Sequence, residues 1–530
     1  MKAISDLELG YSDAENYRRR ENKEILNRVF VRNSYLDRLC DPAISFLMGE
    51  KGTGKTAYAV YLANNDYKDT LGSLKYIRET EYQKFVVLKR EKSLTLSDYV
   101  SIWRVIIYLL MSQQIKNREG GLEFIRRFTR MGAIQAAIDE YYHRAFSPEI
   151  IQALQFVQES KIAAEILSKH AKIGAEDAEA ITFSESRFQT NLFYIQNQFE
   201  QALSQARLKS NHILFIDGID IRPEEIPYPE YLDCIKGLAN AVWEVNNDFF
   251  PTIKGGGGRM RVVLLVRPDI FESLGLQNQN TKARDNSVFL DWRTEYANHR
   301  SSDIFRTIDH LLSSQQHEAL PDGAAWDAYF PWDATNVFDE YEVPTSFIAF
   351  LRWSYYRPRD IITMLKMLQD LAAESGKGRS EFTNKEFEAP EFQRVYSDYL
   401  LGEVKDHLTF YYSKGDYERF LKFFEYLHGR NKFSWEQFVE AYEQFQRDCG
   451  SSKAEMPRFM ASSGDFLQFL YDLNVLCYIE RPVNDKPYVR WCFRERSYAN
   501  IAPKVKQGVE YQIFYGLAKS LNVGQEFRRS

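Results

Sequence analysis

The segment FLMGEKGTGKTAYAVYLAN, residues 46–64, constrains the fold more than any other stretch of this chain. Residues 49–56 within it match the pattern G-x-x-x-x-G-K-[ST] in full. The apolar residues 43–48 predict a short buried strand, and residues 56–64, with Ala and Leu on one face, predict a helix. A glycine-rich loop between a strand and a helix can curl so that its N–H groups face phosphate oxygens. The pattern therefore predicts a phosphate-binding loop.

All eight residues of this loop are candidate contacts to a nucleotide: Gly49, Glu50, Lys51, Gly52, Thr53, Gly54, Lys55 and Thr56. Lys55 is expected to bridge the β- and γ-phosphates, and Thr56 is expected to bind Mg²⁺. The expected ligands are therefore ATP and Mg²⁺. The alternative is a glycine-rich turn that only joins a strand to a helix.

A second apolar run, residues 213–216, ends in Asp217, and Asp220 follows three residues later. Such a run predicts a buried parallel strand, whose carboxyl end is where ligands bind in open α/β sheets. Asp217 is therefore the second candidate Mg²⁺ ligand, beside Thr56. The alternative is that Asp217 only caps a turn.

The position after Asp217 bears on catalysis. Many hydrolysing ATPases carry a glutamate there to polarise the attacking water, whereas this chain has Gly218. Asp220 or Asp217 itself must then position the water, or hydrolysis is slow. Slow turnover is therefore expected.

Residues 261–266, which are apolar after Arg261, predict another central strand, and Arg267 follows it. At that end of the sheet, in register with Asp217, Arg267 could sense the γ-phosphate and stabilise charge that develops during transfer. The alternative is a structural ion pair between Arg267 and Asp217 or Asp220.

The order of these motifs, followed by VFLDW and RPRDIITMLK, resembles the AAA+-related and STAND-type P-loop ATPases. Among them, the chain is most similar to bacterial P-loop ATPases of which some lie in defence loci. The resemblance covers roughly residues 15–370. It implies an α/β fold: a P-loop NTPase core with a parallel sheet, a helical insertion and a helical lid. A C-terminal winged-helix-like domain is a common companion of such ATPases.

The resemblance also implies roles for four arginines. Arg267 matches a sensor after the central strand, and Arg284 is the positional candidate for an arginine finger. Arg359 matches a lid sensor in the sequence Arg-Pro-Arg, where Pro358 suits the first turn of a helix. Arg32 is a candidate contact to adenine, in the segment before the phosphate loop.

The expected domains follow the chain: the N-terminal part of the ATPase core (residues 1–95), a helical insertion (96–207), the rest of the core (208–300), the lid (301–372) and the winged-helix-like domain (373–530). Residues 84–90 predict the second strand of the core. Amphipathic stretches predict helices in the insertion, which serves either as scaffold or as a docking surface for a partner.

The C-terminal region predicts two helices and a β-hairpin, which is a winged-helix pattern. Ser434 is the expected N-cap of the first helix, with Gln437 placed for a capping box. Residues 480–530 contain 10 Lys and Arg against 5 Asp and Glu. Five of these basic residues lie on or beside the hairpin: Arg481, Lys486, Arg490, Arg494 and Arg496.

Such a wing could bind DNA phosphates. The second helix, however, carries two aspartates and no basic residue, which suits a major groove poorly. Contact with a protein, or a solvated basic edge, are the alternatives.

Composition narrows the class of protein. The net charge of −6 over 530 residues argues against a basic coat for wrapping nucleic acid. The five cysteines are scattered, which predicts a reducing compartment without disulfides or a zinc site. No apolar run approaches the length of a membrane span. A soluble, cytoplasmic protein without membrane partners is expected.

Three functions remain open. The first is an ATP-binding, slowly hydrolysing switch that couples nucleotide state to a protein partner or effector, alone or as a homo-oligomer. A place in antiviral defence is implied by the resemblance alone. The second is a DNA-acting loader or remodeller, and the third is an adaptor that holds nucleotide only for structure. A P-loop kinase is disfavoured because no acceptor site is evident.

Overall fold

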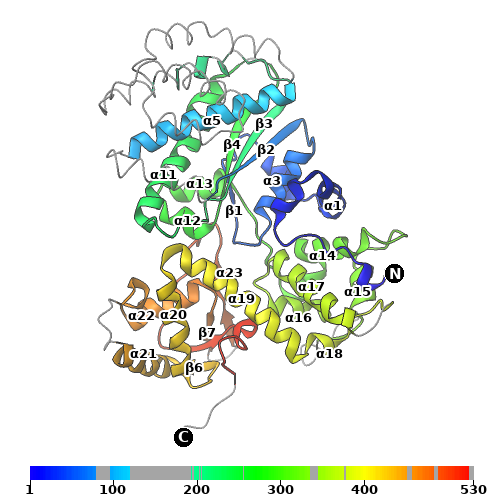
Figure 1. Ribbon diagram of the computed structural model, residues 1–530, viewed down its shortest axis with the longest axis vertical. Helices are drawn as coiled ribbons and strands as arrows, with labels where there is room; N and C mark the ends of the chain where they lie inside the picture. Colours follow the sequence, from blue (N-terminus) through cyan, green and yellow to red (C-terminus); the bar gives the residue numbers. More distant parts are fainter. Residues whose placement is uncertain are drawn as a thin grey trace, which may run out of the picture. The chain divides into compact units, whose positions relative to one another are not determined.

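We analysed a computed structural model of the chain (Figure 1). It describes residues 1–78, 96–119, 206–254, 256–334, 344–374, 378–449, 456–482 and 487–524, with isolated positions between 193 and 204. The chain divides into two compact units. The sheet unit comprises Ser34–Gly49 and Lys55–Phe289, and the C-terminal unit comprises Met1–Asn33, Glu50–Gly54 and Leu290–Ser530.

The sheet unit is an α/β structure with a five-stranded parallel sheet in the order β2-β3-β4-β1-β5. Its strands are β1 (Phe46–Met48), β2 (Thr70–Tyr76), β3 (Asn211–Asp217), β4 (Met260–Val266) and β5 (Ser287–Phe289). Its helices are α2 (Ser34–Leu39), α3 (Lys55–Asn64), α5 (Leu96–Glu119), α11 (Tyr228–Glu244), α12 (Pro268–Ser273) and α13 (Gln279–Asp285), and α11 continues into η4 (Val245–Phe249) and η5 (Phe250–Thr252).

The order of the strands determines which face each helix covers. The crossover from β1 to β2 runs one way along the sheet, and the crossovers from β2 to β3 and from β3 to β4 run the other way. Right-handed crossovers therefore place α3 on one face and α5 and α11 on the other. Figure 1 shows this arrangement, with β3 and β4 between the two layers.

The strands that flank the phosphate loop and the candidate carboxylate lie where the sequence predicts them. β3 and β4 are almost wholly buried, as expected for parallel strands covered on both faces. The predicted strand over residues 84–90 falls outside the described residues. β2 was not predicted from the sequence. Its Gly72 lies so close to α3 that a Cβ there would be 2.6 Å from the carbonyl oxygen of Leu62.

The C-terminal unit begins with short N-terminal helices and continues with a helical layer. The N-terminal helices are η1 (Ile4–Asp6), η2 (Ala14–Arg18), η3 (Arg20–Asn22) and α1 (Lys23–Val29). The helical layer contains η6 (Tyr296–Ser301), α14 (Asp303–Ser313), α15 (Ala324–Tyr329), α16 (Ser346–Trp353), α17 (Pro358–Glu374), α18 (Asn384–Phe387) and α19 (Pro390–Tyr411). Pro358 is the first residue of α17, which confirms its predicted place in the first turn of a helix.

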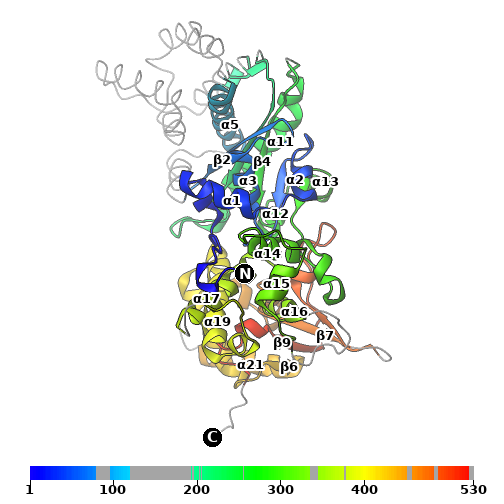
Figure 2. The same ribbon diagram turned by 90° about the vertical axis from the view of Figure 1, so that its right-hand side faces the viewer.

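The remaining part of this unit combines helices with a four-stranded antiparallel sheet in the order β6-β9-β7-β8. It contains α20 (Lys414–Phe423), η7 (Phe424–Leu427), β6 (Lys432–Ser434), α21 (Trp435–Cys449), η8 (Arg458–Met460), α22 (Ser463–Asp472), β7 (Leu476–Glu480), β8 (Tyr488–Arg490), α23 (Cys492–Glu495), β9 (Glu510–Ile513) and η9 (Tyr515–Leu517). Figure 2 shows β6, β9 and β7 beside α21.

The capping box predicted at the start of α21 is confirmed. The Gln437 N–H donates to the Ser434 hydroxyl over 3.4 Å, and the Ser434 N–H donates to the Gln437 side chain over 2.9 Å. The two helices before a hairpin are likewise present, as α21, α22 and the antiparallel pair β7 and β8.

The two units divide the chain differently from the domains expected from the sequence. Residues 1–33 were expected in the core but belong to the C-terminal unit, where the Ile4 N–H donates to the Arg379 carbonyl over 2.7 Å. Of the expected helical insertion, α5 is described and most of residues 120–205 are not. Among the described helices, none has the length and apolar character needed to cross a membrane.

Candidate functional site

The first residues of α3 and the last residue of β3 meet in the sheet unit. The Thr56 hydroxyl donates a hydrogen bond to the Asp217 carboxylate over 2.6 Å, although 161 positions separate the two residues. The Gly218 N–H donates to the other carboxylate oxygen over 2.8 Å. The parallel sheet thus brings the two candidate Mg²⁺ ligands into direct contact.

Asp217 lies in an environment that opposes its negative charge. It is 6% exposed, and burial together with the neighbouring charge of Asp220 raises its pKa to about 6. The Thr56 hydroxyl, the Lys55 charge and the Gly218 N–H act in the opposite direction but do not restore the ordinary value. A carboxylate of this kind gains more from a divalent cation than a solvated one.

The raised pKa predicts a pH effect on stability without Mg²⁺ or nucleotide. Because the folded protein holds this proton more tightly, the stabilisation is complete below the ordinary pKa near 3.8 and is lost as the pH rises through about 6. Asp217→Asn removes the buried charge. We expect it to raise the free energy of unfolding by about 2–3 kcal/mol at pH 8 and by much less at pH 4.5.

Thermal melting of both proteins at the two pH values measures this difference. A gap between variant and wild type that is equal at both values would contradict the assigned burial of the Asp217 charge.

Gly218 cannot carry the carboxylate that many ATPases have at this position. Its φ is +90°, and a Cβ would lie 2.2 Å from the carbonyl oxygen of Ile77. The Ile77 N–H in turn donates to the Asp217 carbonyl over 2.8 Å, which continues the β2–β3 pairing past the end of β2. The absence of an acidic side chain here is therefore imposed by the backbone.

Gly218→Ala is accordingly expected to destabilise the protein by about 3 kcal/mol or more, through the left-handed φ and the clash with Ile77. Gly54→Ala is a matched control, since Gly54 has φ +95° but no atom within 4 Å of a Cβ. We expect it to cost only the backbone strain, about 1–2 kcal/mol. Equal melting temperatures for Gly218→Ala and wild type would refute the close approach.

Within the phosphate loop, the Lys55 ammonium donates to the Gly49 carbonyl over 2.8 Å and is largely buried. Gly52 and Gly54 have φ of +89° and +95°, which favour glycine and give the loop its curl.

Three loop carbonyls are bound by groups of the C-terminal unit, to which Glu50–Gly54 belongs. The Arg357 guanidinium donates to the Lys51 carbonyl over 2.9 Å, and the indole of Trp292 donates to the Thr53 carbonyl over 2.9 Å. The Arg359 N–H approaches the Gly52 carbonyl at 3.4 Å.

These contacts determine which way the loop N–H groups point. In a trans peptide the N–H lies opposite the preceding carbonyl, and no cis bond occurs among the described residues. The N–H groups of Gly52 and Gly54 therefore point away from Arg357 and Trp292. Neither has a hydrogen-bond acceptor within the described parts of the chain. A phosphate group would provide the missing acceptor.

Two side chains of the loop form ion pairs with other parts of the C-terminal unit. Glu50 forms an ion pair with the buried Arg496 of the C-terminal unit. Lys51 pairs with Glu403 over 3.1 Å and with Asp406 over 2.7 Å, both on α19. Two of the four variable residues of the loop, Glu50 and Lys51, are thus fixed by their side chains.

Arg267 is placed differently from the expectation. Ile216 pairs with Leu264, so Arg267 lies two residues farther along the sheet than Asp217 and is not in register with it. Its buried guanidinium binds Asp269, with an Nε to carboxylate distance of 3.0 Å. The structural ion pair is therefore formed with Asp269.

The arginines around Pro358 both lie against the phosphate loop. Besides its contact to Lys51, Arg357 binds Asp360 in α17, and Asp360 is fully buried. The guanidinium of Arg359, the expected sensor, donates to the Ser12 carbonyl over 3.0 Å. Sequence reasoning missed Arg357 as a loop contact, although it belongs to the same Arg-Pro-Arg motif.

Trp292 and Arg496 were also missed as loop contacts. Trp292 follows β5 closely, which is a usable signal at the carboxyl end of a parallel sheet. The partner of Arg496 is 446 positions away, and no local pattern indicates it.

The other candidates are more exposed. Arg284, at the end of α13, has a side chain 72% exposed that pairs with Asp285 over 2.9 Å. Arg32 is exposed. Asp220 is half-buried and lies close enough for its charge to raise the pKa of Asp217.

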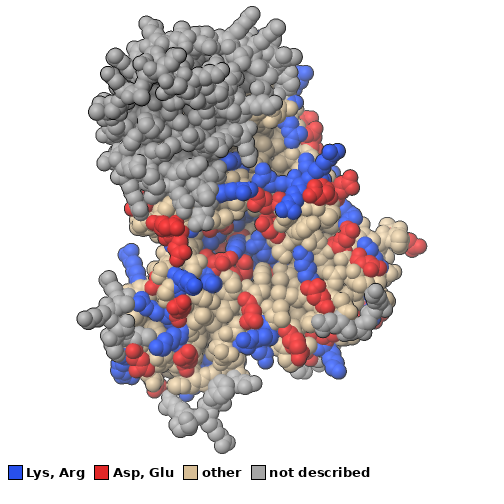
Figure 3. Space-filling model, in the orientation of Figure 1, with Lys and Arg blue, Asp and Glu red and all other residues tan. Residues whose placement is uncertain are grey.

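The basic residues of the hairpin region are largely engaged within the protein. Arg481 pairs with Glu510, and Arg490 pairs with Glu480 and Glu495. Arg494 donates to the Tyr296 hydroxyl over 3.1 Å, Arg496 pairs with Glu50, and Lys486 lies outside the described residues. On the face in Figure 3, Lys and Arg lie among Asp and Glu.

The donor set at the end of β3 fits Mg²⁺. A hydroxyl and a carboxylate are oxygen ligands, and Mg²⁺ in phosphate-transfer sites takes only one or two protein ligands beside phosphates and water. In the described ranges, no cluster of three or more His, Cys, Asp or Glu suited to a metal occurs.

Comparison with models of known protein families, with curated proteins and with solved structures finds no significant match to this chain.

Proposed function

We propose that this protein is an Mg²⁺-dependent ATP-binding switch that hydrolyses ATP slowly. The observation that carries the proposal is the hydrogen bond between Thr56 and Asp217, because it joins the loop threonine to a buried carboxylate whose charge is only partly compensated. The hydrogen bonds that the Lys51 and Thr53 carbonyls accept from Arg357 and Trp292 support the proposal. They leave the N–H groups of Gly52 and Gly54, on the other side of the backbone, available to a phosphate.

In this proposal, the loop N–H groups and Lys55 bind the phosphates, while Thr56 and Asp217 hold Mg²⁺. When bound, Mg²⁺ would neutralise charge on the phosphates during transfer. Arg267 and Arg359 are the proposed sensors, Arg284 is the proposed finger of a neighbouring copy, and Arg32 the proposed contact to adenine. The fold would be that of a P-loop ATPase of the AAA+/STAND-related group, with a winged-helix-like C-terminal region.

Slow hydrolysis follows from Gly218, whose backbone excludes a glutamate beside Asp217. The switch character follows from the loop contacts. Glu50–Gly54 is bound through Trp292, Arg357 and Arg496, so a phosphate that shifts the loop also acts on the C-terminal unit. That unit would carry the signal to a protein partner.

Release of phosphate from ATP, followed with and without Mg²⁺, tests the proposal. The expected result is slow turnover that requires Mg²⁺. Tight ATP binding without any turnover would instead support an adaptor that holds nucleotide for structure, and absence of ATP binding would refute the proposal.

Asp220 is the proposed water-positioning residue. Asp220→Asn is expected to lower turnover by about 100-fold and to leave ATP affinity nearly unchanged, because a general base acts on the chemical step alone. Steady-state kinetics and a binding titration separate the two effects. Unchanged turnover would assign the water to Asp217 or to a residue of a partner.

A further inference from the structure

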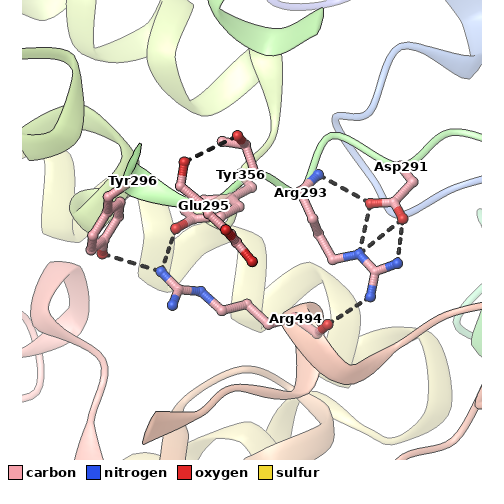
Figure 4. Close-up of a pocket in the computed structure, with 7 residues that line it drawn as sticks. Asp291, Arg293, Glu295, Tyr296, Tyr356 and Arg494 are labelled. Atoms are coloured by element: carbon pink, nitrogen blue, oxygen red, sulfur yellow. Dashed lines mark hydrogen bonds and ion pairs between the residues drawn. The ribbon is translucent and has the colours of Figure 1, made fainter. Parts of the chain in front are cut away.

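A second cavity lies wholly within the C-terminal unit and takes no part in the proposed nucleotide site. Its volume is about 540 Å³, which is within the range of pockets for small ligands. Residues after β5, Tyr356 before α17, and Arg494 on α23 line it (Figure 4).

Arg494 is the unusual member of this lining. Its guanidinium lies over the rings of Tyr296 and Tyr356, at 5.5 and 4.7 Å from their centres, and donates to both hydroxyls. Among the described residues, no carboxylate pairs with it, and its Nε is buried without an acceptor. A guanidinium stays charged, so this half-buried cation lacks a counter-ion.

The other arginine of the pocket, Arg293, does have a carboxylate partner. Arg293 is bound to the Asp291 carboxylate, with an Nε distance of 2.7 Å, and also donates to the Arg494 carbonyl over 2.7 Å. Figure 4 shows both contacts beside the unpaired guanidinium. Arg293 thus fixes the backbone that carries Arg494.

The pocket also contains a carboxylate, Glu295, which accepts from the Asn298 side chain over 3.3 Å. Within the described ranges, it forms no ion pair. An anion alone would be repelled by it, so a suitable ligand offers hydrogen-bond donors as well as an oxyanion.

We propose that this pocket binds a phosphate group of a small ligand that also carries hydroxyl or amino donors, with Arg494 as the phosphate contact and Glu295 as the acceptor for the donors. Tyr296 and Tyr356 position the guanidinium. Tyr356 has φ +54°, a strained value for a non-glycine residue.

Three segments that line the pocket also contact the phosphate loop, so a ligand that moves these segments would also affect the loop. Trp292, between Asp291 and Arg293, binds the Thr53 carbonyl, and Arg357, next to Tyr356, binds the Lys51 carbonyl. Arg496, two residues after Arg494, pairs with Glu50. The prediction that the pocket ligand changes ATP affinity depends on the proposed function. The prediction that Arg494 binds phosphate does not depend on it.

Calorimetric titration with inorganic phosphate tests the pocket in the full chain. Inorganic phosphate has two expected binding places, the pocket and the loop of residues 49–56. Lys55→Ala separates them, because a separate pocket keeps its phosphate in that variant. Arg494→Gln is expected to weaken phosphate binding by about tenfold or more, and Arg352→Gln, another arginine of this unit, should leave it unchanged.

If Lys55→Ala abolishes phosphate binding, the phosphate binds at the loop of residues 49–56 and not in the pocket, and the proposal is overturned. If Arg494→Gln binds phosphate as the unmodified protein does, the proposal is overturned. Tyr296→Phe keeps the ring and removes one hydroxyl that holds the guanidinium. It should weaken binding several-fold, and an unchanged affinity in this milder variant also counts against the assignment should Arg494→Gln fail to fold.

Discussion

Lys55→Ala is expected to weaken ATP binding by about 100-fold or more, since the ammonium would make charge-assisted hydrogen bonds to two phosphates. Its burial and its contact with the Gly49 carbonyl show that the side chain folds back over the loop, where phosphates would displace the carbonyl. Calorimetric titration with ATP in the presence of Mg²⁺ measures the loss.

Lys254→Ala provides the matched control, because Lys254 is an exposed lysine of the same unit. It should bind ATP as the wild type does. A melting temperature near that of wild type for Lys55→Ala would show that lost binding is not lost folding. Unchanged ATP affinity in Lys55→Ala would remove the loop from nucleotide binding.

Asp217→Asn is expected to retain part of the ATP affinity and to lose turnover by about 100-fold or more, because the amide is a weak ligand for Mg²⁺. The size of the side chain is kept, and its single oxygen can still accept the Gly218 N–H. Phosphate release over a series of Mg²⁺ concentrations measures the effect.

The control here is Asp248→Asn, an exposed aspartate of the sheet unit. Its turnover should match the wild type at every Mg²⁺ concentration. Hydrolysis by Asp217→Asn at the wild-type rate would place the metal on other residues and leave the Thr56 contact as structural.

The parallel core could be predicted from the sequence because its signals are local. Residues 213–216 and 262–266 are continuous apolar runs, which are typical of buried parallel strands. The glycine pattern of residues 49–56 fixes a strand, a loop and a helix in order. Thr56 and Asp217 could be paired in advance because Asp217 ends one parallel strand and Thr56 follows the loop at the carboxyl end of another.

The contacts around the loop could not be predicted because they join distant positions. Nothing near Glu50 indicates Arg496, and nothing near Lys51 indicates α19. The register of Arg267 depends on how β3 and β4 slide against each other, which their apolar middle residues leave open. The sequence shows that Gly218 takes the place of an acidic residue. The reason, the close approach of the Ile77 backbone, is a tertiary contact that the sequence does not show.

The central claim is that residues 49–56 and Asp217 form one site for ATP and Mg²⁺. Titration of the wild-type protein with ATP, with and without Mg²⁺, tests it most directly. The account predicts one ATP site per chain, with affinity raised by Mg²⁺ above pH 6 and raised much less at pH 5, where Asp217 holds a proton. Absence of saturable ATP binding, or binding indifferent to Mg²⁺ at pH 8, would contradict it.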